Sequence, residues 1–185
     1  LNDDADLFAP VIRSTQMRSI WLGINLLTAL LASWFIGLFE ATLEKVVMLA
    51  VLMPVVASMG GIAGSQTLTL IVRGLALGQV SSQNTRALLK KELGVGGLSG
   101  VIWAVIIGMI AVLWFQEPLL GVVIGAAILT NIVFAALSGV AIPVILKKLN
   151  IDPALSGAVI LTTVTDIVGF VVFLGLGTWL LLPSL

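Results

Sequence analysis

Long apolar stretches separated by short polar segments dominate the sequence. Five of them reach about 20 residues or more, which at 1.5 Å per residue crosses a hydrocarbon core of about 30 Å. They cover residues 20–39, 46–72, 93–115, 119–146 and 154–182. Membrane β-strands would be shorter and would alternate apolar with polar positions. The pattern therefore predicts an all-α integral membrane protein with five transmembrane helices per chain.

Composition supports this fold and excludes several functions. Of the 185 residues, 59% are hydrophobic and 10% are charged, whereas soluble domains carry about 25% charged residues. The net charge is zero and no dense Lys/Arg patch exists, so we expect no nucleic-acid partner. The chain has no Cys and no His, which removes thiolate chemistry and the commonest general base. We therefore expect a protein that is not an enzyme.

The basic residues predict the orientation in the membrane. Eight of the nine fall on one side of the predicted spans: Arg13, Arg18, Arg73, Arg86, Lys90, Lys91, Lys147 and Lys148. Lys45 falls on the other side. By the positive-inside rule the N-terminus is cytoplasmic and the C-terminus lies outside, in a cell (inner or plasma) membrane. We expect a cytoplasmic linker at residues 1–19, either a short interfacial helix or a frayed segment, followed by a five-helix pore domain at residues 20–185.

Asp166 is the strongest single-residue signal in the sequence. The other eight acidic residues lie outside the predicted spans, whereas Asp166 lies about 18 Å into the last one, near mid-membrane. A charged residue there costs about 2.5–3.5 kcal/mol and normally faces a water-filled path or a partner. No Lys or Arg occupies a comparable depth. Asp166 is therefore either protonated and hydrogen-bonded, or ionised beside water and a cation.

The helix face around Asp166 carries small or hydroxylated residues. Ala158 and Thr162 lie two turns and one turn earlier, and Gly169 follows three residues later, so we expect all of them on one side. This face leaves room for water or an ion beside the carboxylate. Helix packing also selects small residues, and the face alone does not decide between these two interpretations.

The second span contains an unusual segment at residues 54–67, PVVASMGGIAGSQT. Its distinctive residues are Pro54, Gly60, Gly61, Gly64, Ser65 and Gln66. Proline removes a backbone donor, and glycines weaken a helix and permit close backbone approach. Carbonyl oxygens freed in this way suit hard cations such as Mg²⁺. The alternative is a packing face of small residues four apart, the interpretation we favour for Gly96/Gly100 and Gly121/Gly125. For Asn25, Thr130, Asn131 and Ser138, we expect hydrogen bonds between helices.

These two segments resemble the transmembrane domain of the MgtE family of Mg²⁺ channels. The matching motifs are WLGINLLTALLASWFIGLFE, PVVASMGGIAGSQTLTLIVRGLALG and DPALSGAVILTTVTDIVGF, and the likeness runs from Arg13 to about Leu182. The resemblance implies a homodimer in membrane lipid, with a pore between subunits that conducts hydrated Mg²⁺. It implies an ion site at Asp166, with Thr162 and Ala158 facing the pore and Gly60, Gly61 and Gly64 near it. Two residues depart from the family pattern. Ile62 stands where the family usually has Asn, and Ala158 stands where some members have Asn.

Charge balance agrees with a dimer. One Asp166 per chain does not neutralise a 2+ ion, whereas two related by a twofold axis do. Mg²⁺ usually keeps several waters and binds one or two carboxylates. Typical family members also carry cytosolic Mg²⁺-sensing regulatory domains, which this chain lacks, so it is either trimmed or naturally short. A secondary transporter, for example a Na⁺/Mg²⁺ exchanger, and a non-conducting assembly subunit stay open as alternatives.

Overall fold

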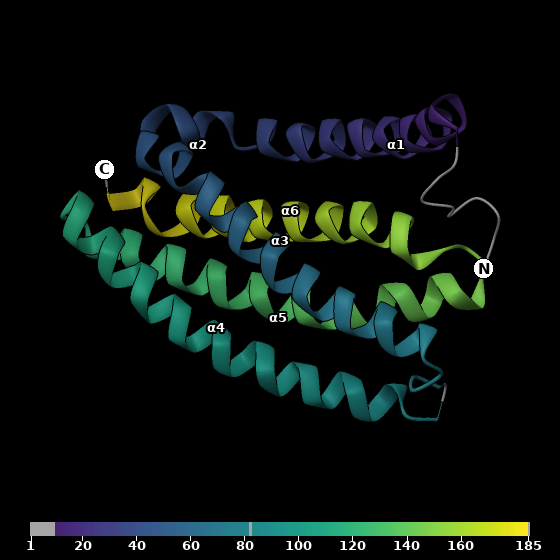
Figure 1. Ribbon diagram of the computed structural model, residues 1–185. Helices are drawn as coiled ribbons and strands as arrows, with labels where there is room; N and C mark the ends of the chain where they lie inside the picture. Colours follow the sequence, from purple (N-terminus) through teal and green to yellow (C-terminus); the bar gives the residue numbers. More distant parts are fainter. Residues whose placement is uncertain (1–9, 82, 185) are drawn as a thin grey trace.

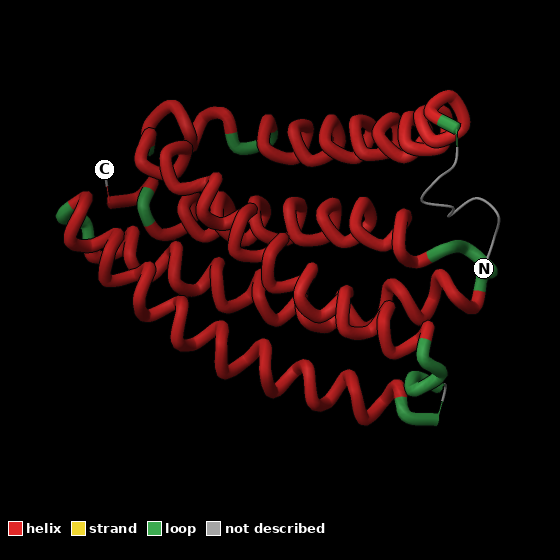
Figure 2. Tube along the Cα trace, viewed as in Figure 1, coloured by secondary structure: helices red, strands yellow, loops and turns green. Residues whose placement is uncertain are grey.

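The computed structural model describes residues 10–81 and 83–184, and their secondary structure is helical (Figures 1 and 2). The α-helices are α1 (Val11–Gly37), α2 (Glu40–Lys45), α3 (Val47–Ala76), α4 (Thr85–Phe115), α5 (Pro118–Lys148) and α6 (Pro153–Leu180), followed by a 3-10 turn at Leu182–Ser184. Five of these helices, all except α2, are long and apolar enough to cross a membrane. This confirms the predicted all-α fold with five spans, which is that of a multi-pass membrane protein.

Four of the five spanning helices are longer than the predicted apolar segments, and α6 is one residue shorter. They have 27 to 31 residues, or about 40–46 Å, against a hydrocarbon core of about 30 Å. The largest difference is at α1, which begins at Val11 rather than at residue 20. A helix satisfies its own backbone groups, so it continues into the polar interface where side chains such as Arg13 are solvated. Residues 11–19 of the predicted linker therefore belong to α1, and residues 1–9 lie outside the described residues.

The short helix α2 was not expected from the sequence. It lies at the turn between α1 and α3, next to the C-terminal end of α6 (Figure 1). Its buried Thr42 forms a hydrogen bond of 2.8 Å between hydroxyl oxygens with Thr178 of α6. Six residues are too few for a hydropathy pattern, and the stabilising contact comes from a residue far along the chain.

Helix α5 is the centre of the bundle and packs against α3, α4 and α6. Its contact with α4 is made through glycines. A Cβ at Gly121 would lie 2.8 Å from the carbonyl oxygen of Gly108, so the two backbones touch where they cross. Gly96, Gly100 and Gly125 are similarly covered by the opposite helix, which confirms the packing interpretation of these glycines.

Helix α1 is loosely attached by comparison. It packs mainly against α6, and Ala32 is its one buried residue. Large apolar side chains such as Leu22, Leu27 and Trp34 are exposed along it. In a membrane protein such a surface suits lipid tails or another apolar helix.

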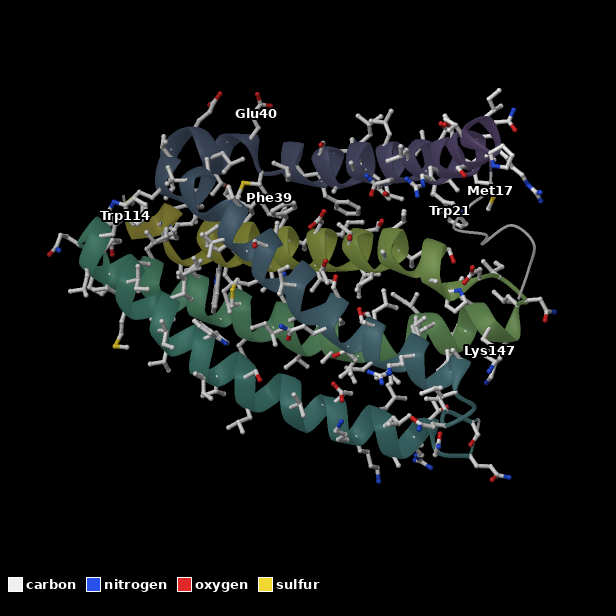
Figure 3. The ribbon with its side chains drawn as sticks, in the orientation of Figure 1. Met17, Trp21, Phe39, Glu40, Trp114 and Lys147 are labelled. Carbon is white, nitrogen blue, oxygen red and sulfur yellow. The ribbon has the colours of Figure 1, made fainter. Side chains whose placement is uncertain are left out.

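The bundle has one basic end, defined here as the end formed by the start of α1 and α4 and the end of α3 and α5. Figure 3 shows Met17, Trp21 and Lys147 at this end, whereas Phe39, Glu40 and Trp114 lie at the opposite end. Tryptophan near both ends is typical of the two membrane–water interfaces. Which end faces the cytoplasm stays a prediction from the positive-inside rule.

Candidate ion-binding site

Asp166 lies at the middle of α6, halfway between Pro153 and Leu180. Its side chain is partly exposed on the surface of the chain. Within the described residues it has no hydrogen-bond or ion-pair partner. Embedding a carboxylate at this depth costs about 2.5–3.5 kcal/mol unless water, a cation or another protein surface solvates it. The fold therefore leaves Asp166 in need of a polar environment that the described part of one chain does not supply.

Ala158 and Thr162 are exposed on the same face of α6, two turns and one turn before Asp166. Thr162 Oγ1 donates to the carbonyl oxygen of Ala158 at 2.9 Å. Because its proton is used within the helix, the hydroxyl oxygen still has lone pairs that accept from water. Gly169 does not share this face, so that expectation was wrong. It is buried against Asn131, because three residues turn a helix about 60° short of a full turn.

Glycines fix how α3 and α6 lie against each other. The two helices are antiparallel and pack through three glycine contacts: Gly64 against Leu161, Gly157 against Leu68, and Gly169 against Val56. Continuing this register places Asp166 level with Met59 and Gly60 of α3. The segment at residues 54–67 of α3 therefore lies at the same depth in the membrane as Asp166.

The three candidate glycines of α3 fall in two environments. Gly60 and Gly64 are buried, since a Cβ at Gly60 would overlap Asn131 and one at Gly64 would lie 2.8 Å from Leu161 Cδ1. Gly61 has no atom within 4 Å of its Cβ position. Helix α3 continues unbroken past Pro54, so these glycines remain helical and the expectation of freed carbonyl oxygens among them was wrong. Gly60 and Gly64 thus bring helices together, and Gly61 presents bare backbone on an open surface.

A stripe of polar side chains runs along the exposed face of α3. We call it the α3 polar stripe, and it consists of Ser58, Ser65, Gln66 and Thr69. None of the four has a hydrogen-bond partner in the part of the chain that the structure describes. Lipid tails offer no hydrogen bonds, so an unpaired polar group facing them is costly. The stripe indicates that this face of α3 meets water or another protein. Ser65 and Gln66 were expected from the sequence as distinctive polar residues of this span. Ser58 and Thr69 were not, although all four recur at helical spacing.

The α3 polar stripe reaches a cavity between α3 and α6. This cavity of about 300 Å³ lies at the basic end and is lined by Thr69 and Arg73 from α3 and by Ala154 from α6. Ala154 lies 12 residues before Asp166, about 120° away around the helix, so the cavity does not belong to the Asp166 face. The candidate site thus combines a carboxylate and a hydroxyl on α6 with bare backbone on α3 at a similar depth.

The carboxylates of one chain do not form a chelating site. Within the described residues, no three side chains among His, Cys, Asp and Glu gather to hold a metal ion. Glu40 and Glu44 line an open cavity of about 590 Å³ at the end opposite the basic one, away from Asp166. Mg²⁺ needs six ligands but usually retains several waters, so one or two carboxylates suffice. Asp166 fits this requirement only with water and a second surface.

Glu92, one of the acidic residues expected outside the predicted spans, is a buried carboxylate. It lies on α4 at 5% exposure. Its Oε2 accepts from Thr67 Oγ1 of α3 at 3.0 Å, and its Oε1 pairs with the exposed Lys91 at 3.1 Å. These contacts join α4 to α3 near the basic end. Both carboxylate oxygens of Glu92 have partners, and Glu92 contacts the buried Thr67 of α3, which is not part of the α3 polar stripe. We therefore leave Glu92 out of the site.

Comparison with known proteins gives one family. The family model described as MgtE, divalent cation transporter, matches residues 53–176, which include Gly60, Gly61, Gly64, Ala158, Thr162 and Asp166. The magnesium transporter MgtE of Bacillus subtilis is 32% identical over 87% of this chain. The protein of the same name from Thermus thermophilus is 36% identical over 89% of it, and that from Enterococcus faecalis is 28% identical over 90%.

These matches cover part of each relative. The chain spans 36% of the length of the first two relatives and 37% of the third. The region matched by the family model contains two of the three motifs that carry the resemblance, the glycine segment of α3 and the Asp166 segment of α6. The chain belongs to the MgtE family of divalent cation transporters.

Proposed function

We propose that this chain is the pore domain of a Mg²⁺-selective channel, in which hydrated Mg²⁺ passes between two copies of the chain. The observation that carries the proposal is Asp166, a partly exposed carboxylate at mid-membrane depth that has no hydrogen-bond or ion-pair partner within the described residues. The names of the relatives support Mg²⁺ as the transported ion.

The proposed ion path follows the surface shared by α3 and α6. Asp166 attracts the ion through its water shell. Thr162 Oγ1 accepts a hydrogen bond from a water ligand of the ion, and Gly61, which has no side chain, leaves room for the water shell. The α3 polar stripe keeps the path wet toward the basic end. Gly60 and Gly64 contribute indirectly, because they let α5 and α6 approach α3 closely.

A second copy completes this site. Two Asp166 carboxylates across a twofold axis balance the charge of one Mg²⁺, and the pairing removes the α3 polar stripe from lipid. A polar half-site that is partly exposed and has no partner within the described residues supports this arrangement.

Mg²⁺ entry into liposomes that contain the purified chain tests the function. We expect entry that follows the Mg²⁺ gradient and proceeds equally with and without a Na⁺ gradient, because the proposed path binds one hydrated divalent ion and no coupled ion. Protein-free liposomes serve as the control. Entry that requires Na⁺ would instead support an exchanger. Absence of entry would favour the assembly-subunit alternative.

A further inference from the structure

Asn131 is a buried amide where three helices meet. It lies on α5 at 0% exposure, and its Nδ2 donates to the carbonyl oxygen of Val56 on α3 at 3.0 Å. This confirms the expected hydrogen bond between helices. The Oδ1 atom is buried and has no partner within the described residues. The orientation of the amide is fixed, because the oxygen is unable to donate to the Val56 carbonyl.

The buried Oδ1 atom of Asn131, which has no partner within the described residues, requires an explanation. Buried polar atoms in native proteins are nearly always paired, and a leucine would fill the same space without leaving an acceptor unsatisfied. A leucine, however, has no donor for the Val56 carbonyl. Asparagine at this position therefore indicates that the hydrogen bond between α5 and α3 is the interaction that matters here.

Two glycines form a slot for the amide. A Cβ at Gly60 of α3 would overlap the Asn131 side chain, and a Cβ at Gly169 of α6 would lie 2.6 Å from Asn131 Nδ2. The side chain thus sits between α3 and α6 and touches the backbone of both. A larger residue at either glycine would overlap the Asn131 side chain, so the amide or one of the helices would have to move.

This slot lies at the depth of the candidate ion site. Gly169 is less than one turn from Asp166 on α6, and Gly60 precedes Gly61 on α3, whose Cβ position is open. The spacing of α3 and α6 at this level sets how far Asp166 lies from the bare backbone of Gly61.

We propose that Asn131 is a positioning residue, which holds α3 and α6 at the spacing that gives Asp166 its affinity for a hydrated divalent cation. The inference rests on the proposed function, because it concerns the same site. Asn131 acts through the two backbones and not by contact with the ion.

The test compares three variants by the Mg²⁺ concentration that gives half-maximal entry into liposomes. Asn131→Leu removes the donor at similar volume, and Gly60→Ala keeps the donor but places a methyl group where the Asn131 amide lies. Thr130→Val is the matched control. The expected hydrogen bond from Thr130 to another helix was wrong, because its hydroxyl donates to the carbonyl oxygen of Ala126 within α5 at 2.9 Å. Removing residues that orient a metal-binding group changes affinity by about 10- to 100-fold. We expect the lower figure, about 10-fold, for the first two variants and no change for the control.

Half-maximal concentration is the chosen quantity because it does not depend on the fraction of protein that folds. A thermal-unfolding scan of each variant in detergent is measured in parallel. A rise in half-maximal concentration for both Asn131→Leu and Gly60→Ala supports the proposal. Lower unfolding temperatures with wild-type half-maximal concentrations would overturn it, because Asn131 would then serve stability alone. A wild-type chain that admits no Mg²⁺ would overturn the proposed function and this inference together.

Discussion

Replacing Asp166 by asparagine is expected to weaken Mg²⁺ binding in the pore by about two orders of magnitude. In a wet pore, a carboxylate about 5 Å from a 2+ ion contributes about 1.7 kcal/mol, so two carboxylates contribute about 3.3 kcal/mol. The substitution keeps size and removes both charges from the dimer. The measurement is the half-maximal Mg²⁺ concentration for entry into liposomes, with selectivity over K⁺ recorded alongside.

Selectivity should fall together with affinity. A monovalent ion gains half as much from each carboxylate, so the preference for Mg²⁺ over K⁺ is expected to fall about tenfold or more. Asp166→Glu is the matched variant, since it keeps the charge one methylene further from the backbone and should retain most of the preference. Asp166→Asn with wild-type affinity and selectivity would show that another group selects the ion.

The second prediction is that two Asp166 faces meet across a twofold axis. The chain contains no cysteine, so a single introduced thiol reports on one position. Ala158→Cys, exposed two turns from Asp166, is expected to give cross-linked dimer for most of the protein with a short bis-thiol reagent. Closed twofold symmetry brings each residue near the axis close to its own counterpart.

The control cysteine replaces Leu98, a residue 67% exposed on α4. Helix α4 packs against α5 and has no place on the Asp166 face, so Leu98→Cys should remain monomeric on the gel under the same reagent. A chain that is monomeric by mass in bilayers or mild detergent and still admits Mg²⁺ would contradict the dimeric pore.

The fold was predictable because each span is long and nearly uncharged. Hydropathy alone found all five spanning helices, but it misplaced the start of α1, where Arg13 is helical yet outside the apolar segment. Helix α2 had no local signal. Its position depends on Thr178, which lies 136 residues further along the chain than Thr42.

The candidate site was predictable in its residue types and less so in its geometry. Asp166 stands out because an acidic residue at that depth is costly. Gly60 and Gly61 look alike in the sequence, but one is covered by Asn131 and the other is open. That difference depends on the register between helices, which a single sequence does not encode in any local pattern. The same reason explains why Gly169 was assigned to the wrong face.

The most direct test of a Mg²⁺-selective pore is the reversal potential of currents through the purified chain in a planar bilayer. With Mg²⁺ gradients and no Na⁺ present, a channel selective for Mg²⁺ should reverse near the Mg²⁺ equilibrium potential and shift by about 30 mV for each tenfold change in gradient, as expected for transfer of two charges. A reversal potential that ignores the Mg²⁺ gradient, or the absence of current until Na⁺ is added, would contradict the account.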